Sequence, residues 1–253
     1  MYKSRKKFKV GLFSLTSCEG CYFGLLDVAQ KFFDLADYVE FQNFRLFEEQ
    51  FHARTEQFDL AFVEGSPLTS ENVEDLQRLR QNSRILVALG SCSHIGGIYQ
   101  LKNYQDKEKI FDHIYAGRAG IENLDVKSLS AYVKVDKVIP GCPVNPEEFI
   151  KFIYQFCRGI DFKITQNPVC LECQHAGYEC VLLKGEICLG PITQGGCQAI
   201  CLKSKQGCLG CRGLLEDAQK ENLIKKLKEN YTDREINKAL EVFGVKEEMK
   251  KEA

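Results

Sequence analysis

The chain has 253 residues, of which 44% are apolar and 27% charged, with 34 basic against 35 acidic side chains. This length suits one large or two small domains with a sizeable core, and the near-zero net charge gives no indication of a nucleic-acid partner. No apolar run approaches the ~18 residues that a membrane span requires, so we expect no transmembrane segment.

The first 160 residues alternate strand and helix signals. Helical spacing of apolar residues begins near Leu25, Ser70 with residues 72–79 predicts a capped helix, and Pro146 opens a helix that carries Cys157. Short apolar runs predict strands at 8–15, 39–44, 58–63, 84–89 and 135–139. The run at 84–89 is typical of a strand buried on both faces of a parallel sheet, so we predict an open α/β sheet.

Cysteine is the unusual component, with thirteen copies. In a reducing compartment thiols persist as metal ligands, nucleophiles or core residues, and we expect a cytoplasmic protein. Four of them, Cys18, Cys21, Cys92 and Cys142, lie where predicted strands end. The carboxyl ends of parallel strands meet at one edge, so these thiols fit a four-thiolate iron-sulfur cluster. A zinc knuckle or redox pair at Cys18-x2-Cys21, and core thiols at the other two positions, remain as alternatives.

Eight further cysteines crowd into residues 170–211, a glycine-rich segment without strand and helix rhythm. Metal cross-links must order such a segment, because it has little hydrophobic core. Eight thiolates suit two four-cysteine sites, either two 4Fe-4S clusters or two structural zinc ions, and spacing alone cannot pair them. They are Cys170, Cys173, Cys180, Cys188, Cys197, Cys201, Cys208 and Cys211.

Several other residues invite more than one interpretation. Cys157 follows the apolar spacing of its helix and is predicted to be a buried structural thiol, and His94 and His175 are predicted to be surface groups or groups behind the ligands. Glu64 ends a strand, either as a hydrogen-bonding or partner-facing carboxylate beside the cluster or as a helix-capping or loop residue. Two amphipathic helices are predicted in residues 214–253, the second capped at Thr232, with a solvated charged face or a docking site for an electron carrier.

Six motifs carry a resemblance to the small subunit of nickel-iron hydrogenases, and within that family to the cytosolic methyl-viologen-reducing (heterodisulfide-reductase-linked) and sulfhydrogenase types. They are Leu15–Cys21, Val63–Ser66, Gly90–Gly97, Gly141–Glu147, Cys188–Thr193 and Gly207–Cys211. The resemblance implies a flavodoxin-like domain over residues 1–160 and a mostly irregular or helical iron-sulfur domain over 161–213. A charged helical tail over 214–253 completes the chain.

The resemblance also assigns the ligands. Cys18, Cys21, Cys92 and Cys142 would hold a proximal cluster, Cys170, Cys173, Cys180 and Cys188 a distal one, and Cys197, Cys201, Cys208 and Cys211 a medial one. Cys170 stands where periplasmic relatives have histidine and Cys201 adds a fourth medial ligand, which favours three 4Fe-4S clusters. Val144 replaces a common second proline and puts only local backbone geometry in doubt.

The implied function is electron transfer between the nickel-iron site of a separate large subunit and an electron-accepting subunit, either a flavin or an iron-sulfur protein. Catalytic residues are then expected in the large subunit and none in this chain. Two alternatives remain. A free-standing ferredoxin-like carrier is compatible with the cysteines alone, whereas a quinone-reductase-type iron-sulfur subunit carries one cluster, usually with an adjacent Cys-Cys pair that this chain lacks.

Overall fold

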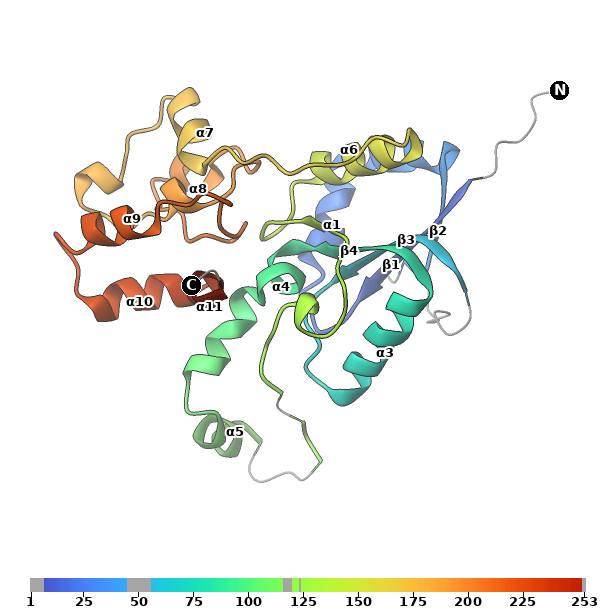
Figure 1. Cartoon of the computed structure of the whole chain (residues 1–253), viewed down its shortest axis with the longest axis horizontal. Coiled ribbons are helices and arrows are strands. Elements are labelled where there is room, and N and C mark those ends of the chain that lie inside the picture. Colours follow the sequence, from blue (N-terminus) through green and yellow to red (C-terminus); the bar gives the residue numbers. More distant parts are fainter. Residues whose placement is uncertain (1–6, 45–55, 116–119, 123, 252–253) are drawn as a thin grey trace.

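A parallel sheet organises the first part of the chain in the computed structural model, which describes residues 7–44, 56–115, 120–122 and 124–251 (Figure 1). Its strands lie in the order β2-β1-β3-β4-β5, and every neighbouring pair is parallel. This is the flavodoxin-like order 2-1-3-4-5, so the predicted α/β class is confirmed. The strands are β1 Phe8–Ser14, β2 Val39–Gln42, β3 Phe58–Glu64, β4 Ser83–Leu89 and β5 Lys137–Ile139.

Helices cover both faces of the sheet. On one face Val10, Leu60 and Val87 of the strands pack with Phe32 and Phe149, which come from α2 and α6. This layer contains α1 (Gly20–Leu25), α2 (Ala29–Asp34) and α6 (Pro146–Cys157), joined in part by the 3-10 turns η1 (Leu26–Val28) and η2 (Leu35–Asp37). Because successive strand residues point to opposite faces, the intervening apolar residues line the second face.

That second face packs on α3 (Ser70–Gln81), through Leu76 and Leu79. The prediction that Ser70 caps this helix is wrong by one position. Thr69 is the N-cap, since its side chain accepts a hydrogen bond from Asn72 N, while Ser70 is the first helical residue. The error is one position because Thr69 and Ser70 both carry a hydroxyl group, and either hydroxyl could accept a hydrogen bond from a free N–H group in the first turn of the helix.

Short helical elements connect β4 to β5, and a loop connects β5 to α6. After β4 come α4 (Gly90–Ile95), η3 (Gly97–Tyr104) and α5 (Lys107–Tyr115), and η4 (Leu129–Ala131) precedes β5. Asn145 caps α6 by accepting from Glu147 N, with Pro146 at the first helical position as predicted. The Cys142–Pro143 peptide bond in the loop before it is cis.

The described part of the chain beyond α6 contains helices, 3-10 turns and isolated bridges but no strand, and it lies beside the carboxyl end of the sheet (Figure 1). Its core is small and apolar, and it joins Leu189 and Ile192 to Leu223, Leu227 and Leu240. The elements are α7 (Val169–His175), η5 (Leu182–Lys184), η6 (Gly190–Ile192), α8 (Ile200–Lys203), α9 (Lys220–Leu227), α10 (Asp233–Glu241) and α11 (Val245–Lys251).

The C-terminal helices bury their apolar faces against the cysteine-rich segment. Both predicted amphipathic helices are present as α9 and α10, and Thr232 forms a capping box with Glu235 at the start of α10. The charged residues lie on the opposite, exposed faces, as a solvated face requires. None of the helices in the described ranges is both long and apolar enough to cross a membrane.

Candidate metal centres

The loops that follow β1, β4 and β5 bring the first four cysteines together. Cys18 lies between β1 and α1, Cys21 within α1, Cys92 within α4 and Cys142 directly after β5. Burial, with smaller contributions from the neighbouring Cys142 and Cys18 thiols, raises the pKa of Cys92 to about 12. Burial likewise raises the pKa of Cys21, with contributions from Glu64 and Cys92. These thiols therefore lie near one another at the carboxyl edge of the sheet.

Two glycines allow the backbone to approach these thiols. Gly90 has φ of +86°, and a Cβ there would lie 2.6 Å from Cys21 Sγ. Gly97 has φ of +59°, and a Cβ there would lie 2.8 Å from Cys92 Sγ. Both backbones adopt the left-handed region that favours glycine, so no other residue type fits without displacing a thiol.

Glu64 lies behind this site, at the end of β3. Its side chain is 2% exposed, and Oε1 accepts a hydrogen bond of 3.2 Å from Cys21 N at the start of α1. Burial raises the pKa of the carboxyl group above its ordinary value of 4.5. Glu64 thus combines two of the interpretations open from the sequence, because it is a hydrogen-bonding carboxylate beside the thiols and satisfies an orphan N–H of a helix.

A second group of thiols surrounds a small cavity in the cysteine-rich segment. Four cysteines line this cavity, together with apolar side chains that include Val181 and Leu202. A Cβ on Gly190 would lie 3.4 Å from the sulfurs of two of them. The four are Cys170, Cys173, Cys180 and Cys188.

Four of the remaining five cysteines, all except Cys157, lie near both of the groups just described. Burial raises the pKa of Cys211 to about 12, and its neighbours Cys197, Cys142 and Cys201 contribute in the same direction. Cys142 belongs to the first group, so Cys211 faces the sheet domain. On the other side, Cys208 N donates to Cys188 Sγ at 3.3 Å. The third group, Cys197, Cys201, Cys208 and Cys211, therefore adjoins both of the others.

The donor sets consist of thiols, which bind both zinc ions and iron-sulfur clusters. In the described ranges, no three His, Cys, Asp or Glu side chains stand close enough to hold one metal ion. A tetrahedral zinc needs all its donors within ~2.3 Å of one point, whereas a cluster distributes four thiolates over several irons. Thiols that line a cavity, with glycines at close approach, suit the cluster.

The other residues singled out in the sequence lie apart from these groups or behind them. Cys157 is half-buried on α6, where it packs against the sheet core. His175 is exposed at the end of α7, and His94 is half-buried in α4 near Gly213.

Sequence reasoning missed three charged residues that hold the groups in place. Arg212 is 1% exposed and forms a bidentate ion pair with Glu148, while Glu172 accepts from the backbone of the Cys197 loop. The position of Arg212 directly after a cysteine, and of Glu172 between two, was the available signal. Partners 64 residues apart cannot be paired from one sequence.

Comparisons with known proteins place these features in a family. The model of the family described as "NADH ubiquinone oxidoreductase, 20 Kd subunit" matches residues 18–156. Sulfhydrogenase 2 subunit delta from Pyrococcus furiosus is 37% identical over 93% of this chain and 99% of its own. A subunit of the F420-non-reducing hydrogenase from Methanocaldococcus jannaschii is 28% identical, with 81% of each chain covered.

Two solved structures are also similar. The first is of an NAD+-reducing [NiFe]-hydrogenase in the H2-reduced state. It has a TM-score of 0.57 and 26% identity, and the match covers 63% of this chain and 96% of that one. The second is an actinobacterial-type NiFe-hydrogenase from Ralstonia eutropha H16. It has a TM-score of 0.58 and 16% identity over 94% and 90% of the two chains, which shows a shared fold alone.

Proposed function

The chain belongs to the NADH ubiquinone oxidoreductase 20 kDa subunit family, as the small subunit of a nickel-iron hydrogenase, and on this premise we propose that it carries electrons through three 4Fe-4S clusters. The hydrogen-splitting site lies in the partner large subunit. This chain would connect that site with an electron-accepting subunit that contains flavin or iron-sulfur centres.

The observation that carries the proposal is the grouping of twelve thiols into three adjoining sets. In the proposed order, Cys18, Cys21, Cys92 and Cys142 hold the proximal cluster, and Cys197, Cys201, Cys208 and Cys211 the medial one. Cys170, Cys173, Cys180 and Cys188 hold the distal cluster. The cavity lined by the last four cysteines and the nearness of Cys211 to both Cys142 and Cys197 support this order. When bound, such clusters accept and release one electron at a time.

The chain's own groups would tune the three sites. Gly210 N donates to Cys208 Sγ at 3.4 Å, and Cys208 N donates to Cys188 Sγ at 3.3 Å. Such N–H donors disperse negative charge on sulfur and favour the reduced form. The buried Glu64 acts in the opposite direction at the first set, because its carboxylate faces the thiolates of Cys21 and Cys92. The different surroundings of the three cysteine sets would thus give the three clusters different reduction potentials.

The family alternatives explain less of the chain. The match to the 20 kDa subunit family spans residues 18–156 and leaves out the eight cysteines from Cys170 onward. Relatives named as hydrogenase subunits cover both parts. A free-standing ferredoxin-like carrier would not need the hydrogenase resemblance over 93% of the chain.

Domain limits and location belong to the same proposal. We infer a flavodoxin-like domain over residues 1–160, an iron-sulfur domain over 161–213 and a helical tail over 214–253. The burial of the tail's apolar faces against Leu189 and Ile192 supports its assembly with the iron-sulfur domain. The content of thirteen cysteines supports a reducing, cytoplasmic compartment.

Purification of the complex with its large subunit tests the proposal. The complex should reduce a viologen dye with hydrogen, and Cys18→Ser or Cys142→Ser should abolish this activity, since the proximal set lies next to the electron source. Cys157→Ser is the matched control and should retain activity, because Cys157 packs half-buried against the sheet core and belongs to none of the three proposed sets. Equal loss in all three variants would refute this assignment, and absence of a large subunit would favour the ferredoxin-like alternative.

A further inference from the structure

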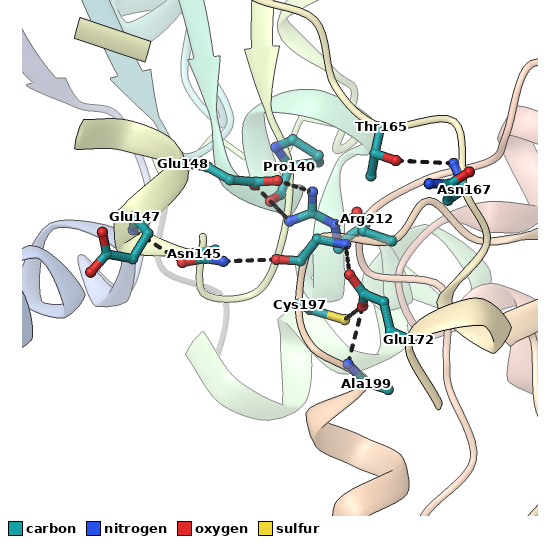
Figure 2. Close-up of polar contacts among 12 residues, drawn as sticks. Pro140, Asn145, Glu147, Glu148, Thr165, Asn167, Glu172, Cys197, Ala199 and Arg212 are labelled. Atoms are coloured by element: carbon teal, nitrogen blue, oxygen red, sulfur yellow. Dashed lines mark hydrogen bonds and ion pairs between the residues drawn. The ribbon is translucent and has the colours of Figure 1, made fainter. Parts of the chain in front are cut away.

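A buried arginine joins the sheet domain to the iron-sulfur domain. Arg212 follows Cys211 and is 1% exposed. Its Nη1 and Nη2 donate to the two carboxylate oxygens of Glu148 on α6 at 3.0 and 2.9 Å. Nη1 also donates to Pro140 O at 2.8 Å, and Nε donates to Gly195 O at 2.7 Å (Figure 2). Four hydrogen bonds thus fix one side chain to three separate segments.

The geometry requires arginine rather than a generic cation. A buried charge is costly unless it is paired and hydrogen-bonded, and the planar guanidinium matches a carboxylate with two parallel bonds. A lysine ammonium would keep the charge but could not reach the carboxylate and both carbonyl groups in this fork arrangement. The pair therefore fixes the relative orientation of the two side chains and also balances their charges.

The same contacts hold the turn that leads into Cys197. Arg212 binds Gly195 O, Asn145 Nδ2 donates to Gly196 O at 2.8 Å, and Gly196 N donates to Glu172 Oε1 at 2.6 Å. Gly196 has φ of +113°, and a Cβ there would lie 2.3 Å from Arg212 Nη2. The turn is clamped from the loop before α6, from α7 and from the Cys211 segment.

Glu172 extends the network toward the second group of thiols. It lies between Cys170 and Cys173, and its Oε2 accepts from Ala199 N at 3.2 Å and approaches Cys197 Sγ at 3.9 Å (Figure 2). Pro140, at the other end, is two residues before Cys142. The network, which we call the Arg212 clamp (Arg212, Glu148, Asn145 and Glu172), therefore touches a segment of all three cysteine sets.

We propose that Arg212 is a positioning residue that fixes the medial cysteine set against the proximal set and so determines electron transfer between them. This inference rests on the proposed function, since it needs clusters at both sets. The rate of electron transfer between two centres falls as the distance between them grows, so a displaced medial set would slow transfer without loss of either cluster. If Arg212 only stabilised the fold, the distance and orientation between the medial and proximal sets would be unchanged in variants that still fold.

The test compares Arg212→Gln and Arg212→Lys with the wild type in the complete hydrogenase complex. Arg158→Gln is the matched control, because Arg158 is exposed at the end of α6 and its replacement removes the same charge. Iron and sulfide are measured first, so that later readouts concern protein with full cluster content. Hydrogen exchange at Gly196 N–H and Ala199 N–H, and magnetic interaction between the reduced proximal and medial clusters, are then recorded.

The expected result is full iron in Arg212→Gln, with faster exchange at both amides, an altered magnetic interaction and a several-fold slower reduction of the medial cluster by hydrogen. Arg212→Lys should keep the medial midpoint potential near that of the wild type because it keeps the charge, but it should not restore the magnetic interaction. Arg158→Gln should match the wild type throughout.

Unchanged exchange, magnetic interaction and reduction rate in Arg212→Gln would overturn the inference. If Arg212→Gln does not accumulate, the same three measurements are made on Glu148→Gln in the complex, and unchanged values there would overturn the inference. This variant keeps the size of the side chain and one acceptor oxygen. Failure of the proposed function has a different signature. In that case the wild type itself would contain no clusters or show no hydrogen-dependent reduction.

Discussion

Replacement of Gly90 by alanine should disrupt the proximal site specifically. Gly90 opens α4 with φ of +86°, and a Cβ would lie 2.6 Å from Cys21 Sγ and 3.5 Å from Gly141 O. The left-handed backbone costs a residue with a Cβ about 1–2 kcal/mol. Contact at ordinary van der Waals distance needs a further ~1 Å between Cβ and sulfur, and overpacking of this kind costs about 1–3 kcal/mol.

The total, about 2–5 kcal/mol, would be relieved most directly by moving Cys21 out of place. Metal-site geometry tolerates displacements of only about 0.5 Å, so cluster binding should fail before the fold does. The Gly90→Ala complex should therefore lose the iron of one cluster and its hydrogen-dependent dye reduction, as measured by iron analysis and a viologen assay.

Gly24→Ala is the control for this experiment. Gly24 lies in α1, three residues from Cys21, and a Cβ there would meet nothing within 4 Å. Alanine in a helix is favoured over glycine by about 0.5–1 kcal/mol, so this variant should bind iron normally. Full iron content and wild-type activity in Gly90→Ala would refute the proximity of Gly90 to a cluster ligand.

Three further changes test other parts of the molecule. Tyr22→Phe should lower the free energy of unfolding by about 1–3 kcal/mol in denaturant titrations, because the buried hydroxyl shares its single proton between Phe13 O and Phe62 O. Glu64→Gln should remove part of the pH dependence of the free energy of unfolding. Burial raises the pKa of the Glu64 carboxyl group, so the contribution of this group to stability is fully present below its ordinary pKa of 4.5 and is lost as pH rises through the folded-state pKa. Stability curves of the wild type and the variant that stay parallel as pH rises above 4.5 would contradict the burial effect. Cys170→His should retain a distal cluster with a higher midpoint potential in redox titrations, since a neutral ligand replaces an anionic one. Loss of the proximal signal instead would place Cys170 elsewhere.

Short-range patterns and parallel topology account for what the sequence predicted well. Strands appear where apolar runs end in turn residues, and Cys18, Cys92 and Cys142 converge because parallel strands present their carboxyl ends at one edge. The strand predicted at 135–139 is shorter in the structure, Lys137–Ile139. Val135 packs against the second face of the sheet, and Asp136 contacts β4 through its N–H to Leu86 O and through its carboxylate, which accepts from Leu86 N. Boundaries of this kind depend on tertiary contacts rather than on local preference.

Long-range polar contacts could not be predicted. Nothing near Arg212 in the sequence indicates that its buried guanidinium pairs with the carboxylate of Glu148. The pairing of the eight cysteines likewise followed from the family resemblance rather than from their spacing. The interpretation of Glu64 was also open until the fold placed its carboxylate against Cys21 N. Each of these contacts joins segments that only the fold brings together.

The packing of the C-terminal helices shows a similar limit. Their amphipathic pattern was visible, but the surface that covers Leu227 and Leu240 is the turn containing Leu189 and Ile192. That turn carries Cys188, so helices without a cysteine support the cysteine-rich segment. A periodic apolar face indicates that a helix packs against something, without identifying the partner.

Metal and sulfide analysis of the purified complex tests the central claim most directly. After subtraction of the iron in the large subunit's centre, three four-cysteine clusters predict about twelve irons and twelve sulfides per copy of this chain, with signals of three 4Fe-4S clusters in redox-titrated electron paramagnetic resonance. Stoichiometric zinc, or a persistent three-iron signal in intact enzyme, would contradict the account.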